Sequence, residues 1–425
     1  MKKYLKFPLY VALAAMIGMN TTACSDDDEP VNTEEGGTTT LSEQEQALKE
    51  VIADYTDKTV IPTYKGMADA AIQLHSLCID IRTKKADGSL TTADVEAAGE
   101  AWKTARDYWE KSEAWLFGPA GDYYIDPHID SWPLDKTGMD ALLSNPAQMA
   151  QMDDEGVYVG NYLGYALQGF HAIEYLLFEL TNTNASGNAT ANSESVAHNL
   201  NYTTEELNYL VGLAADLRNQ CILLEACWAG TENVTAEKQQ ILTDTELDKG
   251  INFGERIKNA GNAGSEYVNY LDVMYDIITA GIQNIANEVG NIKIGNPTGK
   301  GLPSGGMEYD PNYIESPYSL TSIRDFLGNI ISIRNAYQGS PSVDGTIQVA
   351  TSTLSSYIAT LDADLDNRVK AAIQDSYDKI SLMGEPFAYT CGASEYDTIN
   401  QDAIDACNVM NDIFDEVKAL LQANH

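Results

Sequence analysis

Basic residues are scarce in this sequence. Its 425 residues include 63 Asp and Glu but only 26 Lys and Arg, which gives a formal net charge of −37. A surface of that sign repels the phosphates of nucleic acid and the headgroups of an anionic membrane, so neither is an expected partner. A high charge also keeps a protein soluble, so acidity alone does not indicate a role in collecting cations.

Cysteine and histidine are few as well, and their spacing excludes several kinds of site. The chain has six Cys and five His. It has no C-x-x-C pair of a zinc knuckle or thioredoxin-type site, and no H-E-x-x-H pair of a zinc protease. The two E-x-x-H helices of a ferritin-like di-iron centre are missing too. Cys391 and Cys407 could be bridged, whereas Cys221 and Cys227 fall on different sides of a helix and should not pair.

The N-terminal apolar run of the sequence, residues 7–19, is too short to span a bilayer comfortably. This run follows three lysines and ends in Thr22-Ala23-Cys24, the order of parts in a signal peptide. A cysteine at the cleavage site resembles the lipobox of bacterial lipoproteins, although Thr21 stands where Leu is usual. We expect residues 1–23 to be the signal peptide and Cys24 to carry the lipid anchor, the only contact with a membrane. A plain secretory signal is the alternative.

Residues 24–40 contain an acidic cluster followed by Pro, Gly and Thr, and they have little to bury. We therefore predict a flexible tether. An acidic cluster directly after a lipidated cysteine resembles the signal that exports some lipoproteins to the cell surface, with a plain solvated linker as the alternative. The prediction is an outer-membrane lipoprotein that faces either the periplasm or the exterior.

Helical periodicity dominates the rest of the chain, and no stretch alternates with period two between turns. The sequence predicts an all-α fold of two bundles of about four helices each. The bundles would cover residues 41–182 and 203–425, joined by a polar linker. Each half has one long loop rich in Gly, Pro and Tyr, which suggests a duplication.

One predicted helix, residues 157–180, carries the pattern Gly169-x-His171-x-x-Glu174. His171 and Glu174 share one stripe of a helix that is apolar nearly all round and has no basic residue of its own. A buried carboxylate needs an Arg, a protonated His or a metal ion as partner. Two ligands do not complete a catalytic zinc site, so a metal site requires other segments. A structural hydrogen bond between the two side chains is the simpler interpretation.

Two other segments could contribute. Glu113 falls among tryptophans on the preceding predicted helix, residues 91–116, on the same side as Arg106. It could pair with Arg106 or face His171 across the bundle. The long loop after this helix contains Asp130 and Asp135, and long loops on a rigid scaffold often hold sites. Capping of turns and helices is the alternative for either Asp.

The segment Gly169-Phe170-His171-Ala172-Ile173-Glu174 resembles the GxHxxE signature of the imelysin family, also called peptidase M75. Supporting similarities include Ser112-Glu113-Ala114, the segment from Ile129 to Asp135, and Glu315-Ser316-Pro317. They run in order from about residue 45 to the C-terminus. The resemblance implies two helical bundles with the motif near their junction, and an exported protein tied to iron uptake.

Two functions stay open from the sequence. In the first, His171 and Glu174, with Glu113, Asp130 or Asp135, bind iron, zinc or a metal-bearing small ligand at the domain junction, in iron acquisition with an outer-membrane or iron-uptake partner protein. In the second, the same residues hold zinc and activate water as an M75-type metallopeptidase. The motif offers only two ligands and no adjacent general base, which favours the binding function.

Overall fold

The protein folds almost wholly into helices. The structure, a computed structural model, describes residues 41–184, 187, 189–190, 192–300, 309–340 and 350–425. The predicted signal peptide, the tether and Cys24 lie outside these residues. No helix within the described ranges is long and apolar enough to cross a membrane. Of the predicted fold class, the all-α character is confirmed.

The longer helices are α1 (Glu43–Tyr55), α2 (Ile61–Asp87), α3 (Thr92–Glu110), α10 (Thr204–Ala229), α16 (Ser322–Gln338), α18 (Ala363–Ser381) and α20 (Asp397–Ala423). The medium and short helices are α4 (Pro119–Asp122), α5 (Ile125–Ile129), α6 (Lys136–Leu143), α7 (Pro146–Met149), α8 (Val157–Tyr162), α9 (Gly169–Leu177), α11 (Ala236–Asp244), α12 (Phe253–Lys258), α13 (Tyr270–Asp276), α14 (Asn284–Asn287), α15 (Gly295–Thr298), α17 (Leu354–Leu361) and α19 (Phe387–Thr390).

Segments of π-helix join several of these elements: η1 (Thr56–Val60) links α1 to α2, while η5 (Ile277–Gln283) and η6 (Glu288–Ile294) flank α14. Short 3-10 helices lie at η2 (Glu113–Trp115), η3 (Tyr165–Leu167), η4 (Thr231–Asn233) and η7 (Ser394–Tyr396). The strands β1 (Phe178–Leu180) and β2 (Ser195–Ala197) pair antiparallel; β1 replaces the end of the helix predicted over residues 157–180, and β2 lies in the region predicted as a linker.

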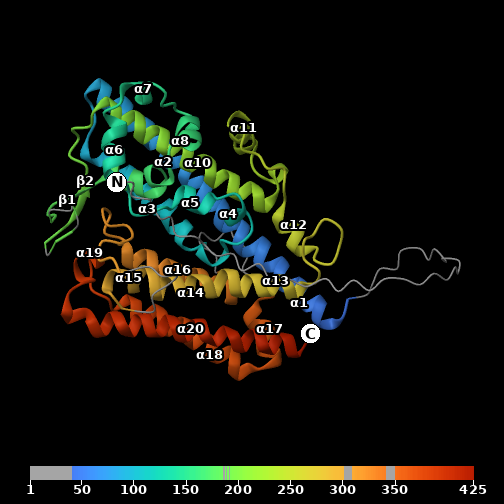
Figure 1. The fold of residues 1–425 in the computed structure, drawn as a ribbon. Helices are drawn as coiled ribbons and strands as arrows, with labels where there is room; N and C mark the ends of the chain where they lie inside the picture. The colour runs from blue at the N-terminus through green and yellow to red at the C-terminus, as the bar shows by residue number, and fades with distance from the viewer. Residues whose placement is uncertain (1–40, 185–186, 188, 191, 301–308, 341–349) are drawn as a thin grey trace, which may run out of the picture. The chain divides into compact units, whose positions relative to one another are not determined.

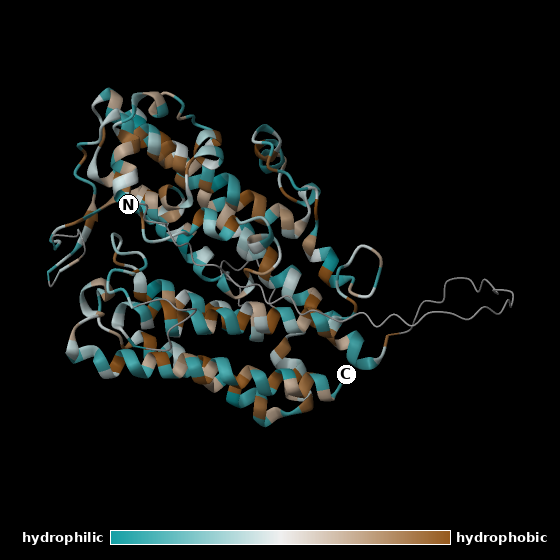
Figure 2. Cartoon of the chain, viewed as in Figure 1, coloured by the Kyte–Doolittle hydropathy of each residue, from teal (hydrophilic) through white to brown (hydrophobic). Residues whose placement is uncertain are grey.

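The helices gather into two groups within one compact unit, residues 41–425. Helix α10 packs on α2, which also packs on α3, while α18 packs on α16 and α20 (Figure 1). Many helices carry both hydrophobic and hydrophilic residues along their length, as amphipathic helices do (Figure 2). The predicted bundles 41–182 and 203–425 and their duplication stay predictions. Helix α10, which the prediction assigned to the second bundle, packs against α2 of the first.

Helix α10 is the central element of the first group. The hydroxyl of Thr203 accepts from the Glu206 amide and the Glu206 carboxylate accepts from the Thr203 amide, so a capping box starts the helix. Every residue from Tyr209 to Trp228 is buried, and Cys221 and Cys227 are both free thiols there. Cys391 and Cys407 are free as well, so the bridge that the sequence allowed is not formed in this structure.

The prediction of one continuous helix over residues 157–180 was wrong. The chain forms α8, breaks into extended backbone at Leu163 and Gly164, turns through η3, and restarts as α9 at Gly169. Gly169 has a φ of 73°, and a Cβ there would lie 2.2 Å from the carbonyl oxygen of Ile129. Only glycine lets α9 start against the segment that ends α5, so Gly169 sets the position of the motif helix.

We expect Gly169→Ala to lower the free energy of unfolding by about 2–4 kcal/mol, because the new methyl group meets both a left-handed backbone and a carbonyl oxygen. Urea titration measures the change. Gly164→Ala is the matched control: Gly164 has a φ of −79° and no atom within 4 Å of its would-be Cβ. A small stabilisation, below about 1 kcal/mol, is expected there. Equal effects of the two substitutions would contradict this account of the motif glycine.

Candidate functional site

A buried arginine lies at the centre of the candidate site. Arg106, near the end of α3, is 1% exposed. Its Nη2 lies 2.6 Å from both Glu110 Oε1 and Glu315 Oε1, and its Nε lies 3.5 Å from Asp325 Oδ2. Its Nη1 pairs with Asp130 Oδ1. One guanidinium thus holds four carboxylates, which come from α3, the residue after α5, the segment before α16 and α16 itself.

A buried lysine continues this cluster. Lys293 on η6 is 1% exposed, and its Nζ lies 3.0 Å from Glu315 Oε1 and 3.7 Å from both Glu110 and Glu113. The same Nζ stands 5.5 Å from the ring centroid of Trp132, a cation–π distance. Lys293 therefore brings Glu113 into the network around Arg106.

Neutral donors also contact carboxylate oxygens of the cluster. Trp109 Nε1 donates to Asp130 Oδ2 at 2.7 Å, and Asn329 Nδ2 donates to Glu110 Oε2 at 2.6 Å. The hydroxyl of Ser316 donates to Asp325 Oδ2. Hydrogen bonds of this kind are what make buried charge tolerable in a protein interior.

The cluster nevertheless has more acid than base. Its buried carboxyl groups are Glu110, Glu113, Asp130, Glu174, Glu315 and Asp325, whereas Arg106 and Lys293 are its permanent cations. Burial raises the pKa of Glu110 and Glu113 well above the usual range for Glu, and that of Asp325 to about 7. Some of these carboxyl groups therefore hold a proton that a bound cation could replace.

Glu174 fixes the orientation of His171. Glu174 Oε2 lies 3.0 Å from His171 Nδ1, which confirms that the two motif side chains share one side of α9. Glu174 Oε1 accepts from the amides of Tyr318 and Ser319 at 2.9 and 2.7 Å, and from the Ser319 hydroxyl at 2.8 Å. Both carboxylate oxygens are thus engaged, and the other ring nitrogen, Nε2, faces Asp130.

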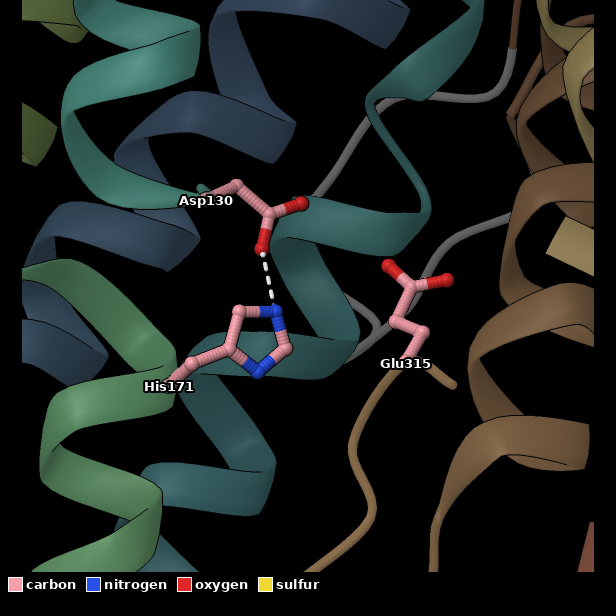
Figure 3. A group of neighbouring side chains, drawn as sticks. All are labelled: Asp130, His171 and Glu315. Atoms are coloured by element: carbon pink, nitrogen blue, oxygen red, sulfur yellow. Dashed lines mark ion pairs between the residues drawn. The ribbon is translucent and has the colours of Figure 1, made fainter. Parts of the chain in front are cut away.

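Three side chains converge beside that nitrogen (Figure 3). His171 Nε2 lies 3.2 Å from Asp130 Oδ1, but neither it nor Glu315 Oε2 makes a hydrogen bond within the described ranges. Asp130, His171 and Glu315 offer ligand atoms that all lie within 4.8 Å of one another. Buried polar atoms without a hydrogen bond can be satisfied by a water molecule or by a bound ion.

Electrostatics holds His171 and Asp130 in their charged forms in this structure. Burial by itself would lower the pKa of His171, but the carboxylates of Asp130 and Glu174 outweigh it and raise that pKa to about 9. Burial would likewise raise the pKa of Asp130, yet Arg106 and His171 hold it well below the usual range. A metal ion at Nε2 would therefore have to displace a proton.

A cavity of ≈ 170 Å³ opens beside this site, with His171 on its wall. The lining residues are Trp132, Pro133, Leu134, Lys136, His171, Asp310, Asn312, Ile314, Pro317 and Tyr318. His171 is 2% exposed, whereas Asp310 and Asn312 are exposed and mark the outer edge. The cavity thus reaches from this outer edge to His171, the member of the cluster that lies on its lining.

The structure brings some of the predicted site residues together and not others. Glu113 and Asp130 join the cluster, but Glu113 pairs with Lys293 and makes no ion pair with Arg106 within the described part of the chain. Glu113 lies on η2, because α3 ends at Glu110 and does not reach residue 116. Asp135 is exposed, and its Oδ1 accepts from the Gly138 amide as the N-cap of α6.

Sequence reasoning missed four members of the cluster, namely Glu110, Lys293, Glu315 and Asp325. Lys293 falls within residues 290–317, which the sequence predicts to be the Gly- and Pro-rich loop of the second half, yet residues 288–294 form π-helix. Glu315 appears in the family resemblance but was not among the candidate ligands. The signal available was Arg106 among the tryptophans of α3, because the five N–H donors of a buried guanidinium need more acceptors than one carboxylate supplies.

These features define an all-helical protein with an acid-rich buried centre beside a cavity, and comparisons with known proteins agree with that class. The model of the imelysin family, Peptidase M75, matches residues 60–411. This chain belongs to that family.

Relatives support the assignment. Iron-regulated protein A of Synechococcus elongatus is 28% identical over 301 residues, covering 70% of this chain and 67% of that protein. The crystal structure of a candidate iron-regulated protein A precursor from Parabacteroides distasonis has a TM-score of 0.68 at 25% identity, over 90% of this chain and 97% of that one. An imelysin-like protein from Psychrobacter arcticum has a TM-score of 0.58 at 15% identity, over 88% and 94%, and supports the fold.

We expect Arg106→Met to lower the free energy of unfolding by about 3–5 kcal/mol at pH 8, because it leaves four buried carboxylates without their shared cation. The loss should be smaller at pH 5. Carboxylates freed from Arg106 have a raised folded-state pKa, so they take up protons as the pH falls and their repulsion decreases. Urea titrations at the two pH values measure both effects.

Arg324→Met is the matched control. Arg324 pairs with Asp107 through two contacts of 2.6 Å, but its side chain is 47% exposed. Its removal should change stability by less than about 1 kcal/mol. An Arg106→Met loss of that same size, or one that does not vary with pH, would contradict the role given to Arg106.

Proposed function

We propose that this protein binds a metal ion or a metal-bearing small ligand at Asp130, His171 and Glu315, and that it serves iron acquisition. The observation that carries the proposal is the pair of buried atoms, His171 Nε2 and Glu315 Oε2, that lack hydrogen bonds beside the cavity. Iron enters through the name of a relative, iron-regulated protein A.

The donor set suits iron or zinc. One imidazole nitrogen and two carboxylate oxygens are ligands of the borderline type that both ferrous iron and zinc accept. Glu174 would act as the orienting partner of the histidine rather than as a ligand, since four donors already engage its oxygens. Arg106 would hold Asp130 and Glu315 in place through their Oδ1 and Oε1 atoms.

A zinc-dependent peptidase of the M75 type is the second candidate. Three protein ligands with a cavity beside them is the arrangement of a catalytic zinc site, in which the open position holds water. The carboxylates nearest to a bound ion, however, are engaged by Arg106 and Lys293, which limits their use as a general base. We therefore favour binding over catalysis.

The location belongs to the proposal as well. We propose an exported lipoprotein anchored to the outer membrane through Cys24, with an outer-membrane or iron-uptake protein as partner. The support comes from the order of charged, apolar and small residues before Cys24. Incorporation of radiolabelled palmitate into the wild-type chain but not into Cys24→Ser tests the anchor.

We expect His171→Ala to weaken the binding of ferrous or zinc ion by more than about 100-fold, because it removes the nitrogen ligand. Glu174→Gln, which keeps the shape but disturbs the orientation of His171, should cost about 10–100-fold. Isothermal titration calorimetry with each ion under anaerobic conditions measures both.

His198→Ala is the matched control, because His198 directly follows β2. Its ring stacks on that of Tyr202 with the centroids 4.1 Å apart, and its Nε2 lies 3.6 Å from Glu179 Oε1. It should leave the affinity unchanged. Wild-type affinity in His171→Ala would overturn the binding proposal and the peptidase alternative together. The peptidase would be favoured if the zinc-loaded wild type cleaved casein, if a chelator stopped this cleavage, and if the His171→Ala variant did not cleave casein.

A further inference from the structure

We propose that the cavity beside His171 receives its metal as a complex with a small polycarboxylate chelator, and that Lys136 recognises a free carboxylate of that chelator. This inference rests on the proposed function, because it names the form in which the metal arrives. It adds a binding residue, Lys136, that lies outside the buried cluster.

The size of the cavity favours a complex over a bare ion. Its volume is ≈ 170 Å³. A single water molecule needs only about 10–15 Å³ of such space, so the cavity could hold several waters or an organic group of similar bulk. A metal with one or two waters would leave room in the cavity for an organic ligand of the metal.

Lys136 supplies the positive charge of the outer cavity. It is the first residue of α6 and is half-buried on the lining. Its Nζ stands 5.1 Å from the ring centroid of Tyr175 and 5.9 Å from that of Tyr318, and it forms no ion pair with any carboxylate in the described ranges. The ammonium has three N–H donors, and within the described ranges none of them makes a hydrogen bond, so an anion could accept from them.

The rest of the lining is consistent with an anionic chelator. Asp310 is the carboxylate of the lining, but it is exposed, and its Oδ1 accepts from the amide and the side-chain nitrogen of Asn312 at 2.8 and 3.2 Å. It therefore belongs to its own turn at the outer edge. Leu134, Ile314 and Trp132 offer apolar surface for the carbon atoms of the ligand.

The test compares two probes on the purified protein by calorimetry: ferrous ion alone, and ferric citrate. We expect Lys136→Met to weaken the binding of ferric citrate at least tenfold and to leave ferrous ion binding unchanged. Lys136→Arg should restore the binding of the complex, since it restores the charge. His171→Ala should weaken both probes.

Lys249→Met is the matched control, because Lys249 Nζ also stands over a tyrosine ring, 5.5 Å from the centroid of Tyr123, but does not line the cavity. It should change neither affinity. Ferric citrate binding that Lys136→Met leaves intact, or a wild-type protein that binds ferrous ion but not ferric citrate, would overturn the chelate proposal and leave the metal site standing. A wild-type protein that binds neither probe would overturn the proposed function itself.

Discussion

The contact between Arg106 and four buried carboxylates is the constraint on which the rest of the site depends. Glu110 shares α3 with Arg106, but Asp130, Glu315 and Asp325 come from segments up to 219 residues away. An arginine cannot lose its charge in a protein, so its burial is tolerable only when these acids surround it. The arrangement therefore fixes α3, the end of α5, the segment before α16 and α16 relative to one another. It also holds Asp130 and Glu315 at the place where His171 arrives on α9.

The same cluster contains more carboxyl groups than cations, and this excess of acid suits the binding of a further cation. Six buried carboxyl groups share two permanent cations, so some of the acids and His171 retain protons. A purely structural cluster could have been built with matched charges. The surplus lies next to a cavity, and Glu174 aims the one imidazole of the cluster toward Asp130 and Glu315. A cation that replaced the proton would gain carboxylate and imidazole ligands at once, which is why binding is the function that we favour.

The sequence was informative where the determinants are local. The i,i+3 pair His171 and Glu174 needs only one turn of helix, and α10 follows from its capping box and apolar pattern. Glu113 was a candidate because it falls among tryptophans on one side of a predicted helix, and Asp130 because it lies in a long loop on a helical scaffold. Lys293, Glu315 and Asp325 could not be found this way, since only tertiary packing brings them to Arg106. The break at Gly164 was missed because an apolar stretch hides the interruption of a buried helix, and the positive φ of Gly169 depends on contact with Ile129.

The position of a bound metal tests the central claim most directly. Crystals soaked in zinc or ferrous salt and measured at the absorption edge of the metal give an anomalous difference map. The account predicts one strong peak in contact with His171 Nε2, Asp130 and Glu315, at about 2.0–2.2 Å from its ligand atoms. A peak among Glu110, Glu113 and Lys293 instead, or no peak in the cluster under conditions where the protein binds the metal in solution, would contradict it.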